Sequence, residues 1–357
     1  SMASESERAA SREGAPADEA ELDERLSRPT AGLVADFARL EGDVLVLGAG
    51  GKMGPTLARM ARRGLDEAGR GGQKVIAVAR FSDPAARAGL EAGGVGTIAA
   101  DLSDRAQIAA LPDAANVIFM AGQKFGTSGA PDATWMMNSY VPALVAERYA
   151  PSRARIVAFS TGCVYANTPV GSGGSREGDP LEPLGEYANS CVGRERMFEH
   201  FARRHGSPLA LFRLNYAVDL RYGVLVDVAR KVRDGEPIDV TMGHVNVIWQ
   251  GDANAMALRS LLYASADPAL ALNVTGPETA TIRALAQRFG ELLGREPVLT
   301  GVEAETALLS NAARAHALFG YPEVPLETLI RWVAGWLGTG GRLLNKPTHY
   351  ETRDGKY

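Results

Sequence analysis

The sequence is short of cysteine, of net charge and of long apolar runs. Two cysteines, Cys163 and Cys191, among 357 residues are too few for a disulfide framework. A net charge of −4 gives no general attraction to nucleic acid or to a membrane surface. No apolar run approaches the roughly 18 residues that cross a bilayer. We therefore expect a cytoplasmic protein that binds neither nucleic acid nor membrane, and no residue pattern indicates a metal site.

The composition that is present suits an α/β enzyme. Hydrophobic residues make up 46% of the chain, and the length allows one large or two moderate domains. Residues 1–28 are rich in Ala, Glu, Ser and Arg and lack a hydrophobic signal core, which predicts a flexible tail. We divide the rest into a nucleotide-binding domain (29–217), a mixed α/β lobe (218–340) and a C-terminal tail (341–357). For this last tail three possibilities stay open: it folds over the active site, it folds over a neighbouring subunit, or it is disordered.

Apolar strands alternate with helical patterns along the chain. Such alternation predicts a parallel sheet with right-handed crossovers. We assign a Rossmann-like doubly wound α/β fold with a smaller C-terminal substrate-binding lobe, from which chain crossings can return to the first domain. The predicted strands are 44–47, 74–79, 96–100, 117–121 and 155–159, with another near 238–240. The predicted helices are 56–68, 105–110, 134–149, 187–204, 224–234, 252–263 and 281–293, and residues 168–183 are a predicted loop.

The first strand ends in a glycine-rich turn that opens directly into a helix. Gly48 permits the tight turn, Gly51 leaves no Cβ where a pyrophosphate approaches the backbone, and Gly54 lets the helix pack on the strand. Pro55 suits a first helical turn, whose free N–H groups attract phosphate. An ordinary strand-to-helix connection is the alternative, but the flanking elements favour a dinucleotide site. The predicted cofactor contacts are Gly48, Gly50, Gly51, Lys52, Met53 and Gly54.

Arg80, at the end of the second strand, predicts which dinucleotide binds. An acidic residue there holds a free ribose 2′-hydroxyl, whereas an arginine accommodates a 2′-phosphate, so NADP is favoured over NAD. Asp83 is close enough in sequence to weaken this inference, and a solvated surface charge is the other interpretation of Arg80. Asp101 and Leu102 close the third strand. We predict that they bracket the adenine, with a plain surface turn as the alternative.

Several motifs further along the chain carry a resemblance. Ser160-Thr161-Gly162-Cys163-Val164-Tyr165 ends the fifth strand, Tyr187 opens the next long helix, and Ala121-Gly122-Gln123-Lys124 follows the fourth strand. With the glycine turn they resemble the extended short-chain dehydrogenase/reductase family, in its NAD-dependent epimerase/dehydratase group, over about residues 42–337. The resemblance implies that Thr161 and Tyr187 form the catalytic pair. It also implies cofactor contacts at Ala121, Gly122, Lys124, Asn138, Ser160, Tyr187 and Cys191.

One position departs from the family pattern. The Y-x-x-x-K motif reads Tyr187-Ala188-Asn189-Ser190-Cys191 here. A lysine one helical turn after the tyrosine would lower the pKa of the phenol and hold the ribose, and a protonated cysteine does neither. Three explanations stay open. Lys124 or Arg194 supplies the charge, or Cys163 acts as a catalytic acid or base where related dehydratases carry glutamate, or both cysteines are small packed residues.

The resemblance implies hydride chemistry through a transient ketone. Tyr187, helped by Thr161, would remove a proton from a substrate alcohol while hydride passes to the nicotinamide. Epimerase, dehydratase and reductase outcomes stay open, although Gly162 in place of the dehydratase aspartate argues against sugar-nucleotide 4,6-dehydration. The expected substrate is a sugar, a sugar nucleotide or a related polyol. A catalytically weak or inactive NAD(P)-binding sensor or structural protein is the alternative. The predicted substrate contacts are Asn215, Arg221 and His244.

The two long helices 134–149 and 187–204 predict self-association. They carry more apolar positions than one face of a sheet requires, and in the resembling family the matching helices form a four-helix bundle between two subunits. We therefore expect a homodimer. The apolar positions in question are Met137, Val141, Leu144, Val192 and Phe198.

Overall fold

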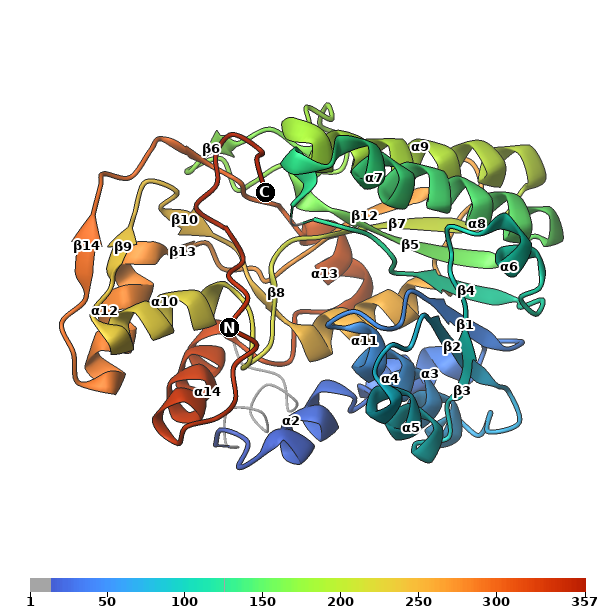
Figure 1. The fold of residues 1–357 in the computed structure, drawn as a ribbon, viewed down its shortest axis with the longest axis horizontal. Coiled ribbons are helices and arrows are strands. Elements are labelled where there is room, and N and C mark those ends of the chain that lie inside the picture. Colours follow the sequence, from blue (N-terminus) through green and yellow to red (C-terminus); the bar gives the residue numbers. More distant parts are fainter. Residues whose placement is uncertain (1–13, 125) are drawn as a thin grey trace.

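A seven-stranded parallel sheet forms the larger part of the molecule (Figure 1). The structure is a computed structural model that describes residues 14–124 and 126–357. The strand order is β12-β7-β5-β4-β1-β2-β3. These strands are β1 (Val44–Leu47), β2 (Val75–Ala79), β3 (Gly96–Ala99), β4 (Asn116–Phe119), β5 (Arg155–Thr161), β7 (Leu209–Leu214) and β12 (Leu270–Val274). The predicted Rossmann-like fold with a smaller C-terminal region is confirmed.

The central strands read as continuous apolar runs because helices cover both faces of the sheet. All four residues of β1 and of β4 are buried. One core lies between the sheet and helices α3, α4 and α11, and the other lies between the sheet and helices α6, α8 and α9. The helices around the sheet are α3 (Ala31–Phe37), α4 (Gly54–Glu67), α5 (Pro84–Ala92), α6 (Arg105–Ala109), α7 (Pro131–Trp135), α8 (Val141–Tyr149), α9 (Gly185–His205), α11 (Gln250–Ser260) and α13 (Ala313–Phe319).

Two strands of the sheet were missing from the sequence prediction. β7 was not predicted as a strand, and the segment containing Leu272 and Asn273 was assigned to the lobe. In the structure β12 pairs in parallel with β7 and forms the outer strand of the large sheet, so the chain crosses back from the lobe to the first domain, a return that the sequence left open. The sequence of β12 is an ordinary apolar strand pattern. Nothing in it shows which sheet the chain rejoins after crossing the lobe.

A smaller lobe follows β7 and packs around a separate core. Three helices and several short strand pairs build it, on the left in Figure 1. Its helices are α10 (Val224–Asp234), α12 (Ile282–Leu293) and α14 (Leu326–Gly338). The short strands outside the large sheet are β6 (Thr168–Pro169), β8 (Ala217–Val218), β9 (Pro237–Asp239), β10 (His244–Val245), β11 (Ile248–Trp249), β13 (Ala280–Thr281), β14 (Val298–Thr300) and β15 (Thr306–Ala307). Among the helices that the structure describes, none is long and apolar enough to cross a membrane.

The N-terminal region is more ordered than its composition indicated. Helix α2 (Glu19–Leu26) begins at Asp18, whose carboxylate accepts a hydrogen bond from the Glu21 N–H at 2.9 Å. Leu22 and Leu26 are fully buried in the lobe core. The prediction of a flexible tail is therefore wrong for residues 14–28, and residues 1–13 lie outside the described part of the chain. The charged composition of this region gave no sign that Leu22 and Leu26, one helical turn apart, are buried.

The C-terminal segment, residues 341–357, packs against the lobe instead of ending as a disordered tail. Thr348 donates from its N–H and its hydroxyl to Asp227 on α10, at 3.0 and 2.7 Å. The ring of Tyr350 is buried in the lobe core. The segment then crosses from the lobe toward the start of α9 (Figure 1). Of the three possibilities that the sequence left open, the structure shows the fold over the candidate active site.

Most of the apolar residues that predicted a homodimer are buried within this chain. Val141, Leu144 and Phe198 are buried in the core of this chain itself, so they are not free to form an interface. The large exposed aromatic residues near them are Trp135 and Tyr140. Met137 and Val192 are half-buried, and the homodimer stays a prediction that rests mainly on the family resemblance.

A buried ion pair joins α9 to the sheet. Glu195 on α9 is fully buried, and its carboxylate accepts from the Arg213 guanidinium on β7 at 2.7 and 3.0 Å. The Ser160 hydroxyl at the end of β5 donates to the same carboxylate at 2.5 Å. The Tyr165 hydroxyl accepts a bond from Arg213 at 2.8 Å. This pair raises the pKa of Arg213 above its usual range, so the guanidinium stays charged.

Removing the buried carboxylate should destabilise the fold strongly. Glu195→Gln leaves the Arg213 charge buried without its counter-charge, and we expect a loss of about 3 to 5 kcal/mol in the free energy of unfolding. Glu199→Gln breaks an exposed ion pair with Arg196 on the same helix and should cost less than about 1 kcal/mol. Urea unfolding of both variants measures the difference, and equal losses would contradict the role given to Glu195.

Candidate active site

A hollow of about 210 Å³ lies where the large sheet meets the lobe. The carboxyl ends of β1, β4, β5 and β7 face it, which is where ligands bind in open parallel sheets. The glycine turn after β1, the start of α9 and the start of α10 complete its wall. Its lining includes Lys52, Met53, Lys124, Ser160, Thr161, Cys163, Tyr187, Asn215, Tyr216, Tyr222, Gln250 and Thr348.

The glycine turn has the shape that a dinucleotide pyrophosphate requires. Gly48 adopts a φ of +82°, and a Cβ there would lie 2.5 Å from the Ala121 nitrogen. A Cβ at Gly54 would collide with the Ala49 carbonyl, because α4 starts directly against the end of β1. A Cβ on Gly51, in contrast, would meet no heavy atom within 4 Å. The backbone at Gly51 is therefore open to a ligand while Gly48 and Gly54 are closely packed, and the turn fits a dinucleotide.

Of the residues expected to contact the adenosine, Arg80 and Asp101 are exposed and Leu102 is buried. The Arg80 guanidinium pairs with the Asp101 carboxylate at 3.2 Å, and both side chains are exposed. Bonds from the Ser103 hydroxyl and N–H lower the pKa of Asp101. Leu102 is buried in the core beside α6 and α8, and its contact with an adenine ring stays a prediction. The apolar side chain is inside because this turn covers the edge of that core.

Tyr187 and Thr161 meet in the hollow. Both side chains line it, and the Thr161 oxygen accepts a hydrogen bond from the Cys163 N–H at 3.1 Å. Tyr187 reaches this place from the first turn of α9, and Thr161 is the last residue of β5. Burial raises the pKa of Tyr187 above its usual value, while the Thr161 hydroxyl and the Arg194 charge lower it. A phenol and a hydroxyl in one hollow can pass a proton to or from a bound alcohol.

Cys191 does not replace the family lysine chemically. Its side chain is buried beside Tyr187, and burial raises the pKa of the thiol to about 11. A thiol with that pKa is uncharged at neutral pH, so it supplies no cation to Tyr187. Both cysteines are free and buried. The geometry fits the interpretation of Cys191 as a small packed residue.

Arg194 is the buried cation on this side of α9. Its guanidinium donates to the Phe159 carbonyl at 2.8 Å and to the Asn138 carbonyl and side-chain oxygen at 3.2 and 2.9 Å. These acceptors are all uncharged, so the positive charge is solvated but not neutralised. The Arg194 charge lowers the pKa of both Tyr187 and Cys191. A Cβ at position 122 would lie 2.5 Å from the guanidinium, so Gly122 makes room for it.

Asn138 organises the site from behind. It lies in a π-helical turn, Met136–Tyr140, between α7 and α8, and its side chain is fully buried. The amide donates to the Gln123 carbonyl at 2.8 Å and to the Ser190 hydroxyl at 3.0 Å, and the amide oxygen accepts from the Gln123 N–H at 2.8 Å. With the Arg194 bond, these contacts occupy the whole side chain. The structure therefore gives it a positioning role in place of the expected cofactor contact.

Lysine side chains gather near the hollow. The Lys124 ammonium lies 5.6 Å from the ring centroid of Tyr187 and 5.7 Å from that of Tyr216. The Lys52 ammonium lies 4.5 Å from the ring centroid of Tyr222. Burial and the charges of Lys346 and Lys124 lower the pKa of Lys52. Like charges brought together in this way favour an anionic ligand.

The three residues expected to bind substrate lie in different places in the structure. Asn215 lines the hollow, is buried, and its amide nitrogen has no hydrogen-bond partner among the described residues. Such an unpaired buried donor is suited to a ligand. His244 lies in β10 of the lobe and does not line this hollow, so a substrate contact at His244 stays a prediction without support from this hollow.

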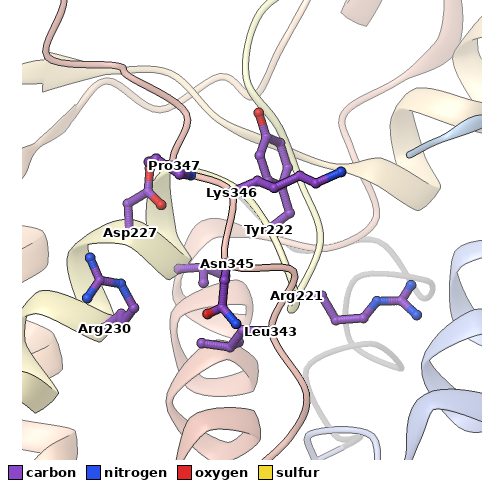
Figure 2. Close-up of a pocket in the computed structure, with 9 residues that line it drawn as sticks. Arg221, Tyr222, Asp227, Arg230, Leu343, Asn345, Lys346 and Pro347 are labelled. Carbon is purple, nitrogen blue, oxygen red and sulfur yellow. The ribbon is translucent and has the colours of Figure 1, made fainter. Parts of the chain in front are cut away.

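Arg221 is already occupied by carboxylates. It pairs with Asp219, Asp23 and Glu19 at 2.9, 2.9 and 3.1 Å, which binds α2 to the lobe. Figure 2 shows it at a second hollow of about 270 Å³, with its guanidinium directed away from Asp227. The structure therefore contradicts the substrate contact that the sequence predicted. The carboxylates of α2 come from a region that the sequence assigned to a flexible tail.

Two contributors to the site escaped the sequence prediction. Tyr216 has a φ of +49°, which is rare for a bulky residue and marks backbone strain beside Asn215. Tyr357 reaches the site from the C-terminal segment, and its hydroxyl lies 3.6 Å from the Cys163 sulfur. The dihedral angle of Tyr216 has no sequence signal. The aromatic residues of the C-terminal segment were noticed, but their path was not predictable.

Comparisons with known proteins agree with this architecture. The model of the NAD dependent epimerase/dehydratase family matches residues 44–265. UDP-glucose 4-epimerase from Thermus thermophilus, solved with NAD, is 19% identical with a TM-score of 0.66, over 82% of this chain and 98% of that one. DesIV, a dTDP-glucose 4,6-dehydratase from Streptomyces venezuelae also solved with NAD, is 19% identical with a TM-score of 0.69, over 83% and 97%. At these identities the likeness shows the fold. No curated protein matches the sequence.

Substitutions at Gly54 and Gly51 should have different effects, the first on the stability of the fold and the second on dinucleotide binding. Gly54→Ala forces a methyl group against the Ala49 carbonyl and should cost about 1 to 3 kcal/mol in the free energy of unfolding. Gly51→Val should change stability by less than about 0.5 kcal/mol, because its side is open, yet weaken dinucleotide binding at least tenfold. Thermal unfolding and fluorescence titration measure the two effects. Unchanged binding in Gly51→Val would contradict the assigned pyrophosphate site.

Proposed function

Since this chain belongs to the NAD dependent epimerase/dehydratase family, we propose that it is an enzyme that oxidises an alcohol of a sugar nucleotide with a bound NAD(P). The substrate class is supported by the structural neighbours, which include a UDP-glucose 4-epimerase and a dTDP-glucose 4,6-dehydratase. One observation carries the proposal for this chain. The side chains of Tyr187 and Thr161 line the same hollow as Lys52 and Met53 of the glycine turn.

In the proposed reaction Tyr187 is the proton acceptor. Its phenolate takes the proton of a substrate hydroxyl while Thr161 donates a hydrogen bond to the reacting oxygens. A dinucleotide held by the glycine turn would supply the acceptor for the hydride on the carbon that bears this hydroxyl. The C–O bond then becomes a carbonyl. Return of hydride to the other face gives an epimer, elimination gives a dehydrated product, and release gives the ketone.

Arg194 is the cation that we assign to the place of the missing lysine. Burial alone makes the Tyr187 phenolate costly, so a nearby positive charge is needed. Arg194 meets this need because it is buried, is held by uncharged oxygens and lowers the pKa of Tyr187. The family lysine would also hold the ribose, and the guanidinium of Arg194 is already engaged with backbone oxygens. We assign that second task to Lys124 at the edge of the hollow.

Epimerisation or simple oxidation and reduction suits the site better than 4,6-dehydration. Gly162 follows Thr161, where sugar-nucleotide dehydratases carry an aspartate, and it supplies no acid. A Cβ at this position would lie 3.1 Å from the Ser310 hydroxyl and 3.3 Å from Asn215, so the surroundings leave little room for a larger side chain. Cys163 is the neighbouring thiol that can exchange a proton. We assign proton exchange to Cys163 only for a substrate that places a leaving group beside its thiol.

A specific observation also favours the second candidate, an NAD(P)-binding protein without turnover. The pKa of Tyr187 is raised by burial, and Cys191 is an uncharged thiol in place of lysine. Both features slow proton removal at neutral pH. Against this candidate stands the retained pair of Thr161 and Tyr187, which cofactor binding alone does not need.

The cofactor preference for NADP is the finer part of the proposal. Arg80 is exposed, and its pair with Asp101 is a surface ion pair that a 2′-phosphate can displace. The solved relatives named above carry NAD and give this preference no support. The homodimer and the cytoplasmic location likewise stay predictions.

Replacing the tyrosine hydroxyl tests the reaction. We expect Tyr187→Phe to lower turnover of UDP-glucose with NAD(P) at least 100-fold and to change dinucleotide affinity less than threefold. Tyr140→Phe, which alters an exposed tyrosine of the same domain, should leave both turnover and dinucleotide affinity unchanged. Wild-type turnover should rise with pH into the alkaline range, because burial raises the pKa of the accepting phenol. Full dinucleotide binding by the wild type without turnover of any sugar nucleotide would favour the second candidate.

Arg80→Ser tests the cofactor preference. If Arg80 holds a 2′-phosphate, the substitution should weaken NADP binding about tenfold and leave NAD binding nearly unchanged. Calorimetric titration of both dinucleotides into wild type and variant gives the two ratios. Arg87→Ser, a nearby exposed arginine, is the matched control. Equal affinities of the wild type for NAD and NADP would refute the preference.

A further inference from the structure

The C-terminal segment is held to the lobe at several places before it reaches the active site. The hydroxyl and N–H of Thr348 donate to Asp227 at 2.7 and 3.0 Å. The ring of Tyr350 is 1% exposed. The Arg353 guanidinium donates to the Thr306 carbonyl and hydroxyl at 2.9 and 2.7 Å. These contacts are spread over six residues, so the path of the segment is determined as it approaches α9.

Two glycines bring the segment onto the first turn of α9. Gly185 begins that helix with a φ of +86°, and Gly355 has a φ of +74°. A Cβ on Gly185 would collide with the carbonyl of Gly355, and a Cβ on Gly355 would collide with the carbonyl of Leu184. The two backbones are therefore in direct contact. Tyr187 lies two residues after Gly185, so this contact brings the segment to the catalytic tyrosine.

The side chain of Tyr357 enters the site from this contact. Its hydroxyl lies 3.6 Å from the Cys163 sulfur. Its ring centroid is 5.7 Å from that of Tyr187, in an edge-to-face arrangement at 78°. The Lys124 ammonium lies 4.5 Å from the Tyr357 ring centroid, closer than to the rings of Tyr187 or Tyr216. One residue from the C-terminal segment thus contacts three groups of the candidate reaction centre.

A further hollow of about 220 Å³ lies beside this ring. Tyr357 and Gly355 line it on one side, and Tyr165 and Leu184 line it on another. Cys163 is shared between this hollow and the one that contains Thr161 and Tyr187. Each hollow alone is smaller than the roughly 300 Å³ of the smallest usual ligand pockets. The Tyr357 ring therefore stands at the end of the reaction centre, where a substrate group next to Cys163 would touch it.

We propose that Tyr357 is a substrate-binding residue of the active site, whose ring covers Cys163 and Tyr187 and contacts the sugar group that is oxidised. The assignment rests on the proposed function of the same site. An aromatic wall here excludes water from the reacting phenol and offers an apolar face to the sugar carbons. Neither effect requires a new chemical step. Tyr357 is a catalytic-site contact, and Gly355 is a positioning residue that acts through it.

The accessibility of Cys163 tests the covering role without any substrate. The full chain is treated with iodoacetamide, and peptide mass spectrometry follows the alkylation of Cys163 and Cys191 separately. We expect Tyr357→Ala to speed alkylation of Cys163 at least tenfold, Tyr357→Phe to leave it within about twofold, and Cys191 to stay protected in both. Lys356→Ala, at the adjacent exposed position, is the control. Gly355→Ala lifts the segment by backbone collision and should speed the reaction as well.

Two results would overturn the covering role. One is an unchanged Cys163 rate in Tyr357→Ala with a melting temperature close to that of the wild type. The other is an equal rise at Cys163 and Cys191 in both Tyr357→Ala and Gly355→Ala, because that pattern reports opening of the whole fold and not of this wall. Thermal unfolding of each variant accompanies the rates.

Affinity for the sugar tests the binding role. Titration of UDP and of UDP-glucose gives two affinities, and their ratio is the factor by which the glucose group tightens binding. Tyr357→Ala should reduce that ratio at least threefold, and Tyr357→Phe should retain it. An unchanged factor, or tighter binding of UDP-glucose by Tyr357→Ala, would overturn the proposal and show a ring that blocks the site. Failure of the wild type to bind either nucleotide would refute the proposed substrate class. The Cys163 rates would then still decide whether Tyr357 covers the site.

Discussion

The buried ion pair between Glu195 and Arg213 is the contact on which the arrangement of the site depends. It joins the long helix α9 to strand β7, and the Ser160 hydroxyl adds strand β5 to the same carboxylate. A charge pair removed from water is stable only in close geometry with its hydrogen bonds complete. Rotation or sliding of α9 along the sheet would break that geometry. The helix therefore has one position, and every residue on its face toward the sheet is placed by it.

The same contact explains why a cation is left for the reaction centre. Arg194 and Arg213 are both buried, and the carboxylate of Glu195 is paired with Arg213. Arg194 donates to carbonyl and amide oxygens and lies over the Phe119 ring, all of them uncharged groups, so its charge acts on the groups around it. Tyr187 and Cys191 lie on the same side of α9 as Arg194, at spacings of seven and three residues. The positive charge of Arg194 lowers the pKa of the Tyr187 phenol, a task that the family pattern gives to a lysine.

Four distant parts of the chain meet at the two hollows that share Cys163. The glycine turn supplies Lys52 and Met53, the end of β5 supplies Thr161, the start of α9 supplies Tyr187, and the C-terminal segment supplies Tyr357. The first three lie at the carboxyl ends of parallel strands or in the helix that follows, so the sheet itself brings them together. The fourth arrives by a separate path over the lobe. Its approach depends on two glycines whose backbones touch, which is a contact between residues 170 positions apart.

The sequence by itself determined the elements whose signals are local. Apolar runs and a glycine turn identified β1 to β5, the helix after the turn and the dinucleotide-binding architecture, and the family resemblance implied that Thr161 and Tyr187 share one site. Tertiary structure alone decided the rest. It returned β12 to the large sheet, neutralised Arg221 with carboxylates of α2, buried Leu102 and closed the site with Tyr357. The reason is physical: strand and helix patterns follow from neighbouring residues, whereas pairing, burial and charge neutralisation depend on which distant segments the folded chain brings into contact.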